Sequence, residues 1–264
     1  MFFGVPSIVF ASGKGGVGKT SIAVNLGVLL AKLGKRVVVV DADVDMAAVS
    51  IMLGIEINPI TLQNVLAGEN TITDAVYEGP HGLYYVPSSL HEEAREIDLT
   101  RLRDAVSKLE LSYEFVLVDS PPGLSAEARA AIASSQQLII VSTPDPAALI
   151  DSLKIRKFAE RSGVTVLGVV LNRVTGDKNE LKPQELTAVL GLPLVATLPE
   201  DVEVRRSASM QQPVEVRAPH SAFCRGLRFL ASALTHEVVP DAKPARASFF
   251  ERVGAFFKRL FAAR

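Results

Sequence analysis

The chain alternates short apolar runs with longer segments in which apolar residues recur at helical spacing. The short runs are rich in valine, isoleucine and leucine and show little polar alternation, which is typical of strands buried on both faces of a parallel sheet. Seven such runs occupy residues 7–11, 36–41, 83–87, 115–119, 137–143, 166–172 and 194–199. The pattern therefore predicts a parallel β-sheet at the centre of the protein.

The segments between these runs predict helices. Their apolar residues lie three or four positions apart, and stop signals such as Gly34, Gly163 and Gly191 mark their ends. The predicted helices cover residues 19–33, 98–109, 125–134, 147–162, 183–190 and 201–210. A strand–helix alternation of this kind implies an α/β fold of three layers, with a doubly wound, mostly parallel sheet.

The C-terminal end differs in composition from the rest of the chain. Residues 236–247 contain two prolines and small polar residues, and we interpret them as a linker that follows a domain of residues 1–235. Residues 248–264 then predict an amphipathic helix, because their large apolar side chains fall on one helical face and their charged side chains lie outside it. The apolar face consists of Phe249, Phe250, Val253, Phe256, Phe257, Leu260 and Phe261.

The charge of the chain is unevenly distributed. The whole sequence has 28 Lys and Arg against 29 Asp and Glu, a net charge of −1. Residues 243–264 hold six basic residues and one acidic residue, a charge of +5, so the preceding 242 residues carry −6. A basic, Phe-rich amphipathic helix is typical of segments that lie in the headgroup plane of an anionic membrane. We predict peripheral membrane binding through residues 248–264, the alternative being a helix docked on the domain's own core.

The cysteine content and the N-terminal sequence indicate the cellular compartment of the protein. A single cysteine, Cys224, excludes an intrachain disulfide framework, a Cys-based zinc cluster and an intrachain iron–sulfur site, and it fits a reducing cytosol. The first ten residues are apolar but lack a charged n-region, so they predict a first strand rather than a secretion signal. We expect a cytoplasmic protein that attaches peripherally to the cytoplasmic face of the cell membrane.

The first predicted strand leads into a glycine-rich loop that predicts phosphate binding. Residues 13–20 read GKGGVGKT, which satisfies G-x-x-x-x-G-K-[ST], and the loop opens a helix as this motif requires. In such a loop the backbone N–H groups surround a phosphate, the last lysine neutralises its charge, and the hydroxyl binds Mg²⁺. The predicted ATP-binding residues here are Gly13, Lys14, Gly15, Gly16, Val17, Gly18, Lys19, Thr20 and Ser21.

The loop holds a second lysine, Lys14, where most phosphate-binding loops have a neutral residue. A cation beside the phosphates stabilises the charge of the transition state, above all when a second subunit supplies it. We therefore predict that Lys14, like Lys19, is catalytic, and that the protein forms an ATP-bound homodimer on which hydrolysis depends. The alternative is an ordinary surface lysine.

Carboxylates follow two of the predicted strands at the edge of the sheet where ligands bind in α/β folds. The run 36–41 continues into Asp41-Ala42-Asp43-Val44-Asp45, and the run 115–119 ends in Asp119. We predict that Asp119 belongs to the shell of a Mg²⁺ ion with Thr20, and that Asp43 contacts this shell and orients the attacking water. Asp41 is either a second contact of the metal shell or a structural anchor, and Asp45 is expected to cap the following helix.

The segments that carry a family resemblance are KGGVGKTS, DADVDMA, DSPPG, VVLNR and LPED. Through them the chain resembles the deviant Walker A ATPases, the MinD/ParA family of P-loop NTPases, over about residues 5–264. The resemblance implies that Lys14 crosses an ATP-sandwich dimer and that Asp43 is the hydrolytic carboxylate. It also implies that adenine is contacted by Asn172, Pro199, Glu200 and Asp201. The implied role is to position the cell-division site, with a protein partner that activates hydrolysis.

Two other roles in this family remain as alternatives. A DNA-partition ATPase would need a basic surface on a body that carries −6, so DNA is the less favoured partner. A flagellar-placement ATPase usually has an N-terminal extension, and here only about six residues precede the first predicted strand. The segment 71–82, TITDAVYEGPHG, has no counterpart that we can assign in the family.

Overall fold

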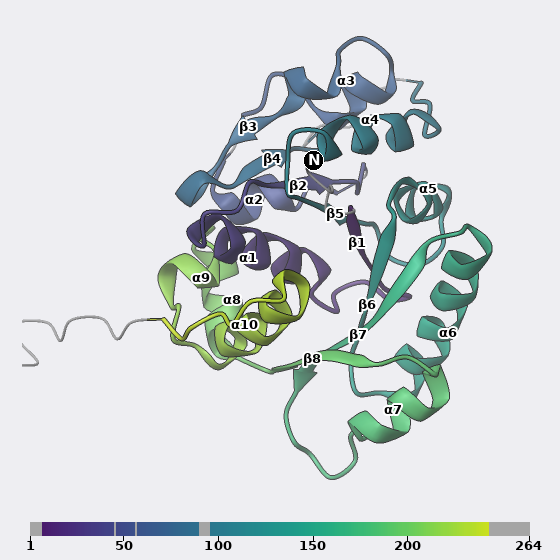
Figure 1. Ribbon diagram of the computed structural model, residues 1–264, viewed down its shortest axis with the longest axis vertical. Coiled ribbons are helices and arrows are strands. Elements are labelled where there is room, and N and C mark those ends of the chain that lie inside the picture. Colours follow the sequence, from purple (N-terminus) through teal and green to yellow (C-terminus); the bar gives the residue numbers. More distant parts are fainter. Residues whose placement is uncertain (1–6, 45, 56, 90–95, 243–264) are drawn as a thin grey trace, which may run out of the picture.

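A single eight-stranded sheet, covered by helices on both faces, forms the centre of the protein (Figure 1). The computed structural model describes residues 7–44, 46–55, 57–89 and 96–242. The strands are β1 (Ile8–Ala11), β2 (Val37–Asp41), β3 (Tyr77–Glu78), β4 (Tyr84–Val86), β5 (Phe115–Asp119), β6 (Gln137–Ser142), β7 (Thr165–Val174) and β8 (Leu194–Pro199). The order is β3-β4-β2-β5-β1-β6-β7-β8, parallel except for the pair β3 and β4. The predicted three-layer, doubly wound fold is thereby confirmed, and each predicted strand is present to within two residues.

The helices form two layers, one against each face of the sheet. One layer consists of α1 (Lys19–Lys32), α2 (Val49–Leu53), α8 (Val202–Ser209), α9 (Val214–Arg217) and α10 (Ala222–Thr235). The other layer consists of α3 (Leu62–Leu66), α4 (Arg101–Glu110), α5 (Ala126–Ser134), α6 (Pro146–Arg161) and α7 (Pro183–Leu190). Alternate residues of a strand belong to the two cores, as Phe10 and Val9 of β1 do, because successive side chains point to opposite faces.

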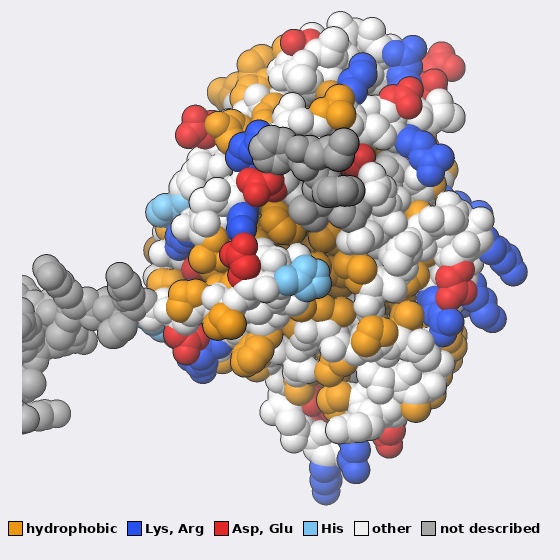
Figure 2. Space-filling view, in the orientation of Figure 1, with side chains coloured by type: hydrophobic (Ala, Val, Ile, Leu, Met, Phe, Trp, Pro, Cys, Tyr) orange, Lys and Arg blue, Asp and Glu red, His pale blue; other side chains and the backbone are white. Residues whose placement is uncertain are grey.

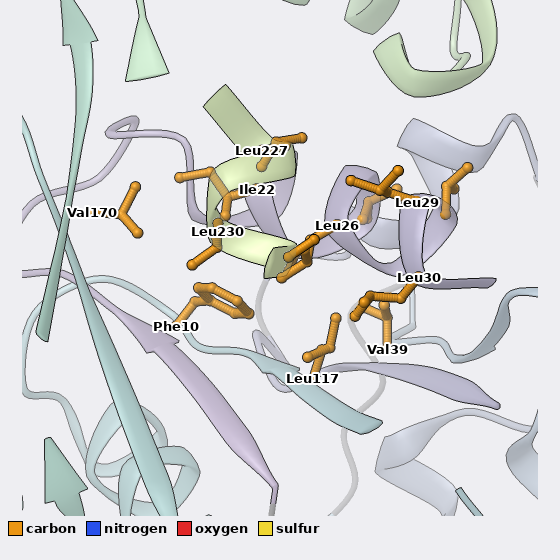
Figure 3. Close-up of a cluster of buried hydrophobic side chains, with 14 of the residues drawn as sticks. Phe10, Ile22, Leu26, Leu29, Leu30, Val39, Leu117, Val170, Leu227 and Leu230 are labelled. Carbon is orange, nitrogen blue, oxygen red and sulfur yellow. The ribbon is translucent and has the colours of Figure 1, made fainter. Parts of the chain in front are cut away.

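Helix α1 lies in the middle of its layer, packed on the sheet with α10 beside it (Figure 3). Figure 3 shows Leu26 and Leu30 of α1 among side chains from the sheet, with Leu230 of α10 close by. Gly27 allows the close approach, since a Cβ there would lie 2.9 Å from methyl groups of both Val39 and Leu83. The helix that begins at the phosphate-binding motif is therefore held by packing against both the sheet and α10.

The elements that were not predicted include α3, β3, α9 and α10. Strand β3 has two residues and pairs antiparallel with β4, Tyr77 opposite Tyr85. Helix α10 begins where the Ser221 side chain accepts a hydrogen bond from the Cys224 backbone N–H at 3.1 Å. Its Gly226 weakens the helical signal, yet a Cβ there would lie 2.6 Å from Cδ2 of Leu198.

The chain beyond α10 is tied back to it as far as it is described. The buried Arg228 pairs with Glu215 of α9 at 3.2 Å, and its Nε donates to the carbonyl oxygen of Pro240 at 3.2 Å. The backbone N–H of Val239 donates to Ser232 Oγ at 3.0 Å. The amphipathic helix predicted over 248–264, with the apolar residues of its membrane-binding face, lies outside the described residues, and the boundaries at 235 and 247 stay predictions. Among the described residues, no helix is long and apolar enough to cross a membrane.

Candidate functional site

The glycine-rich loop joins β1 to α1 at the carboxyl edge of the sheet, where β1 lies between β5 and β6. Gly16 and Gly18 have φ of +72° and +100°, a conformation that residues with a Cβ rarely adopt. A Cβ at Gly13 would lie 2.1 Å from the Asp151 Cβ, so α6 packs directly against the loop. The conformation of the loop thus depends on glycine both for its turns and for its close contacts.

Lys19 lies at the base of this loop and is buried. Its Nζ donates to Ser12 Oγ at 3.0 Å, and Ser12 Oγ donates in turn to the Lys14 carbonyl oxygen at 2.7 Å. Burial lowers the pKa of Lys19, while the charges of Asp119 and Asp43 act in the opposite direction. A buried ammonium that has lost part of its hydration favours an anionic ligand, and a phosphate supplies one. Sequence reasoning did not select Ser12, although it directly precedes the motif.

Asp119 and Thr20 form a buried pair beside Lys19. The Thr20 hydroxyl donates to Asp119 Oδ2 at 2.5 Å, and Asp119 Oδ1 is buried with no hydrogen-bond partner among the described residues. Burial raises the pKa of Asp119 to about 6, although the Thr20 hydrogen bond and the charge of Lys19 act to lower it. A carboxylate with an unused oxygen beside a hydroxyl is a donor set that suits Mg²⁺.

The number of protein donors at this point is small. Mg²⁺ at nucleotide sites usually takes one or two protein ligands and fills its shell with phosphate oxygens and water. The Thr20 hydroxyl and the Asp119 carboxylate are donors of this number and kind. In the described part of the chain, no group of three or more His, Cys, Asp or Glu residues could hold a metal ion.

Asp41 anchors the loop that follows β2. Its Oδ2 accepts hydrogen bonds from the backbone N–H groups of Ala48 at 2.9 Å and Val49 at 3.0 Å, at the start of α2. Burial and the neighbouring charge of Asp119 raise the pKa of Asp41 well above its usual range. These hydrogen bonds are those of a structural anchor, which is one of the two roles considered for Asp41, the other being a contact of the metal shell. The capping role expected for Asp45 lies outside the described residues.

Asp43 lies on the same loop, half-buried near the phosphate-binding residues. Its Oδ1 accepts a hydrogen bond from the Met46 backbone N–H at 3.1 Å, and its charge acts on Lys19. The carboxylate is therefore placed beside the region where a terminal phosphate would bind. Its predicted role in orienting water stays a prediction.

A cavity of 370 Å³ opens beside the phosphate-binding loop. It brings together four residues of separate segments that were predicted to contact adenine, with Gly18 and Ser21 of the loop region. Its full lining is Gly18, Ser21, Asn172, Arg173, Pro199, Glu200, Asp201, Val204, Arg205, Ala208 and Phe223. Sequence reasoning missed Arg173, the residues of α8 and Phe223 of α10. Arg173 and the α8 residues follow the predicted contacts in sequence, whereas Phe223 lies 22 positions beyond Asp201 and had no such signal.

Two polar side chains of this cavity also fix its walls. Asn172 Nδ2 donates to the Val17 carbonyl oxygen at 2.7 Å, which ties the end of β7 to the phosphate-binding loop. Asp201 accepts hydrogen bonds from the backbone N–H groups of Glu203 at 2.9 Å and Phe223 at 3.0 Å, so one carboxylate joins the starts of α8 and α10. The Asn172 and Asp201 side chains are therefore held in place by the segments that form the cavity.

Lys14 contacts its own chain rather than the centre of the loop. Its Nζ lies 3.0 Å from Oδ1 of Asp145, the residue that caps α6, and both side chains are about two-fifths exposed, at 40% and 44%. Sequence reasoning did not select Asp145. The catalytic role of Lys14 across a dimer stays a prediction.

The Asp119→Asn variant is expected to stabilise the nucleotide-free protein at pH 8. The pKa of Asp119 in the folded state, about 6, exceeds the ordinary value of 3.8. The folded state therefore binds this proton more tightly than the unfolded state, which stabilises the fold at low pH. This stabilisation falls as the pH rises above 3.8 and is lost as the pH passes through 6. Asparagine avoids this loss, which is about 3 kcal/mol at most. Thermal unfolding at pH 5 and pH 8 should show a gain in Tm that is larger at pH 8. The control is Asp104→Asn, which changes an exposed carboxylate of α4. Equal Tm values for Asp119→Asn and wild type at both pH values would contradict the expectation.

Comparison with known proteins relates this site to nucleotide-binding proteins. The CobQ/CobB/MinD/ParA nucleotide-binding domain matches residues 8–214. An uncharacterized ATP-binding protein of Methanocaldococcus jannaschii is 35% identical over 260 residues, which are 98% of this chain and 97% of the relative.

Two solved structures share both sequence and fold. The crystal structure of the cell division ATPase MinD of Pyrococcus furiosus has a TM-score of 0.84 and 32% identity, and the match covers 88% of this chain and 99% of that one. The septum site-determining protein MinD of Pyrococcus horikoshii, in complex with Mg-ADP, has a TM-score of 0.82 and 33% identity, with 86% and 94% covered.

Proposed function

The chain belongs to the CobQ/CobB/MinD/ParA nucleotide-binding family, and we propose that it is an ATPase that binds Mg-ATP in this site and uses it to switch between monomer and dimer. The observation that carries the proposal is the meeting of three features at one edge of the sheet. These are the glycine-rich loop with the buried Lys19, the Thr20–Asp119 pair, and the cavity lined by Asn172. They correspond to the phosphates, the metal and the base of a nucleotide.

Each residue then has a role set by its position. Lys19 and the N–H groups of the loop bind the phosphates, and Asn172 with Pro199 and Glu200 orients the base. Mg²⁺ would be held by Thr20 and Asp119, and when bound it neutralises charge on the phosphate oxygens. Asp43 accepts a hydrogen bond from the attacking water at its carboxylate and so orients that water. Lys14 of a second subunit adds positive charge beside the phosphates.

We further propose that the ATP-bound dimer attaches to the cytoplasmic face of the cell membrane and helps to position the division site. Two similar Pyrococcus proteins, a cell division ATPase and a septum site-determining protein, support this role. The basic, Phe-rich segment 248–264 supports the attachment. One such segment binds weakly, whereas two in one dimer bind together, and avidity raises the affinity by about 10²–10⁴. A protein that stimulates hydrolysis completes the proposed cycle.

The charge distribution favours this role over DNA partition. On the face shown in Figure 2, acidic and basic side chains are interspersed. Helix α6 exposes Lys154, Lys157 and Arg161, but Glu160 lies among them. A non-specific DNA-binding surface needs several unopposed basic side chains, and the strongest concentration of positive charge in the sequence is in 243–264.

Co-sedimentation with anionic liposomes tests nucleotide switch and membrane attachment together. Wild type should pellet with ATP and stay in solution with ADP, whereas a chain truncated after Ala247 and the Phe256→Glu variant should stay in solution with either. Phe256→Glu removes an apolar contact with the lipid and adds a charge that hydrocarbon excludes, so we expect at least a tenfold loss of bound fraction with solution ATPase activity intact.

Phe229→Glu is the matched control, because Phe229 is an exposed phenylalanine of the folded domain, on α10. It should pellet like wild type. Lipid binding by Phe256→Glu at the wild-type level would overturn the membrane role of 248–264, and equal pelleting of wild type with ATP and ADP would overturn the switch.

A further inference from the structure

We propose that Asp145 is a positioning residue that holds Lys14 within its own subunit and releases it when the ATP-bound dimer forms. The inference rests on the proposed function, in which Lys14 acts across the dimer. It adds a residue that sets how readily that dimer assembles. The observation behind it is the 3.0 Å ion pair between Lys14 Nζ and Asp145 Oδ1.

The Asp145 carboxylate is fixed before it meets the lysine. Its Oδ1 accepts a hydrogen bond from the Ala148 backbone N–H at 2.9 Å at the start of α6, and its Oδ2 accepts one from the Thr143 hydroxyl at 2.6 Å. A carboxylate held in this way presents its charge at a defined place without a further loss of side-chain entropy. Asp145 is therefore a prepared acceptor for the ammonium group.

The backbone of Lys14 is fixed from the other side. The carbonyl oxygen of Lys14 accepts a hydrogen bond from Ser12 Oγ, which in turn accepts one from Lys19 Nζ. The close contact of Gly13 with Asp151 holds α6, and with it Asp145, against the loop. The phosphate-binding lysine and the second lysine thus share one hydrogen-bonded segment, whereas the Lys14 side chain is directed to α6.

The pair lies at the surface, where a second copy of the chain can compete for it. The Lys14 and Asp145 side chains are 40% and 44% exposed. An exposed ion pair changes an equilibrium by a factor of about five at most, so it orders Lys14 without preventing its release. Nucleotide phosphates carry more negative charge than one carboxylate and attract the ammonium more strongly. Each dimer breaks two such pairs, which raises its dissociation constant by up to about 25-fold.

Asp145→Asn separates the charge from the cap. Asparagine is as good an N-cap as aspartate and keeps an oxygen for the Ala148 N–H, but it loses the ion pair. With a non-hydrolysable ATP analogue at low ionic strength, analytical ultracentrifugation should show a dimer dissociation constant about tenfold below that of wild type. The difference should shrink at high salt, because the pair is exposed and screened.

A second measurement follows Lys14 itself in the nucleotide-free protein. Reductive methylation read by mass spectrometry should label Lys14 several-fold faster in Asp145→Asn than in wild type. The matched control is Glu160→Gln, on the same helix, whose carboxylate pairs with Arg156 at 2.7 Å. It should leave both the labelling of Lys14 and the dimer constant unchanged.

The outcomes separate this inference from the proposed function. If wild type dimerises with the analogue and Asp145→Asn has the same dissociation constant, the positioning role of Asp145 is overturned while the switch stands. If Lys14 labelling is the same in both proteins, the ion pair does not hold Lys14 in solution and the inference also fails. If wild type binds the analogue and stays monomeric, the dimer switch fails and the role of Asp145 fails with it.

Discussion

Replacing Lys19 with alanine is expected to raise the dissociation constants for ATP and ADP by about 100-fold or more. The ammonium group lies buried at the base of the glycine-rich loop with Ser12 Oγ as its hydrogen-bond acceptor. A charge-assisted hydrogen bond to a phosphate contributes about 1.5–3 kcal/mol, and a 100-fold change corresponds to about 2.7 kcal/mol. Loss of this one group therefore removes most of the phosphate affinity. Titration calorimetry with each nucleotide measures it.

The nucleotide-free fold should survive this substitution. Burial lowers the pKa of Lys19, which means that the charged side chain is held at a cost to the folded state. We expect an unliganded Tm equal to or above that of wild type, and loss of the Tm increase that ADP gives wild type. That increase reflects about 2.7 kcal/mol when the ligand is at 100 times its dissociation constant. Lys35→Ala, just beyond the end of α1, is the control, and normal nucleotide affinity in Lys19→Ala would refute the assignment of the loop.

The Asp43→Ala variant should bind ATP and dimerise like wild type but lose turnover by about 10²–10⁴-fold. This range is what one positioned proton acceptor contributes to a rate. The carboxylate lies on the loop after β2, and its charge acts on Lys19. In the proposed site, however, the contacts with nucleotide and metal come from Lys19, Thr20 and Asp119. Phosphate release at saturating ATP, together with nucleotide affinity, separates the two effects.

Alanine at position 43 also removes the acceptor for the Met46 N–H, so a second variant is needed. Asp43→Asn keeps an oxygen for that hydrogen bond and loses the negative charge. If both variants lose turnover, the charge of the carboxylate is required. If Asp43→Asn keeps turnover and Asp43→Ala loses it, the effect comes from the loop conformation. If both variants keep wild-type turnover, another group orients the water. Asp177→Ala, in an exposed loop, is the control.

The parts of the fold that could be predicted are those in which local pattern and tertiary packing agree. A run such as residues 115–119 has no polar face to expose, so its burial on both sides follows from composition alone. Strand β3 has no such signal, because two residues cannot form a pattern and only the partner β4 makes them a strand. Helix α10 has apolar residues at helical spacing, but Gly226 lowers the helix propensity of the segment. Glycine is needed there because a Cβ would collide with Leu198 of β8, a contact that the sequence does not reveal.

The same distinction applies to the site. The phosphate loop, Asp119 and Thr20 are identifiable because motif residues are adjacent in sequence and strand ends share one edge of the sheet. Asp145 is 131 positions from Lys14, and only the packing of α6 against the loop brings them together. Arg173 enters the cavity lining through a left-handed backbone, φ +59°, which no sequence pattern here indicated.

The burial of α1 limits where the protein can move during a nucleotide cycle. Its side chains pack against the sheet and against α10 beside it, and because protein cores are close-packed, a shift of even a fraction of a turn would require rearrangement of both neighbours. The loop after β2, which holds Asp43, and the start of α6, which holds Asp145, are the segments to which the proposals above assign changes in the cycle. If the protein works as proposed, α1 is the fixed frame of reference for the cycle, and we expect the loops around its start to be the segments that reorganise.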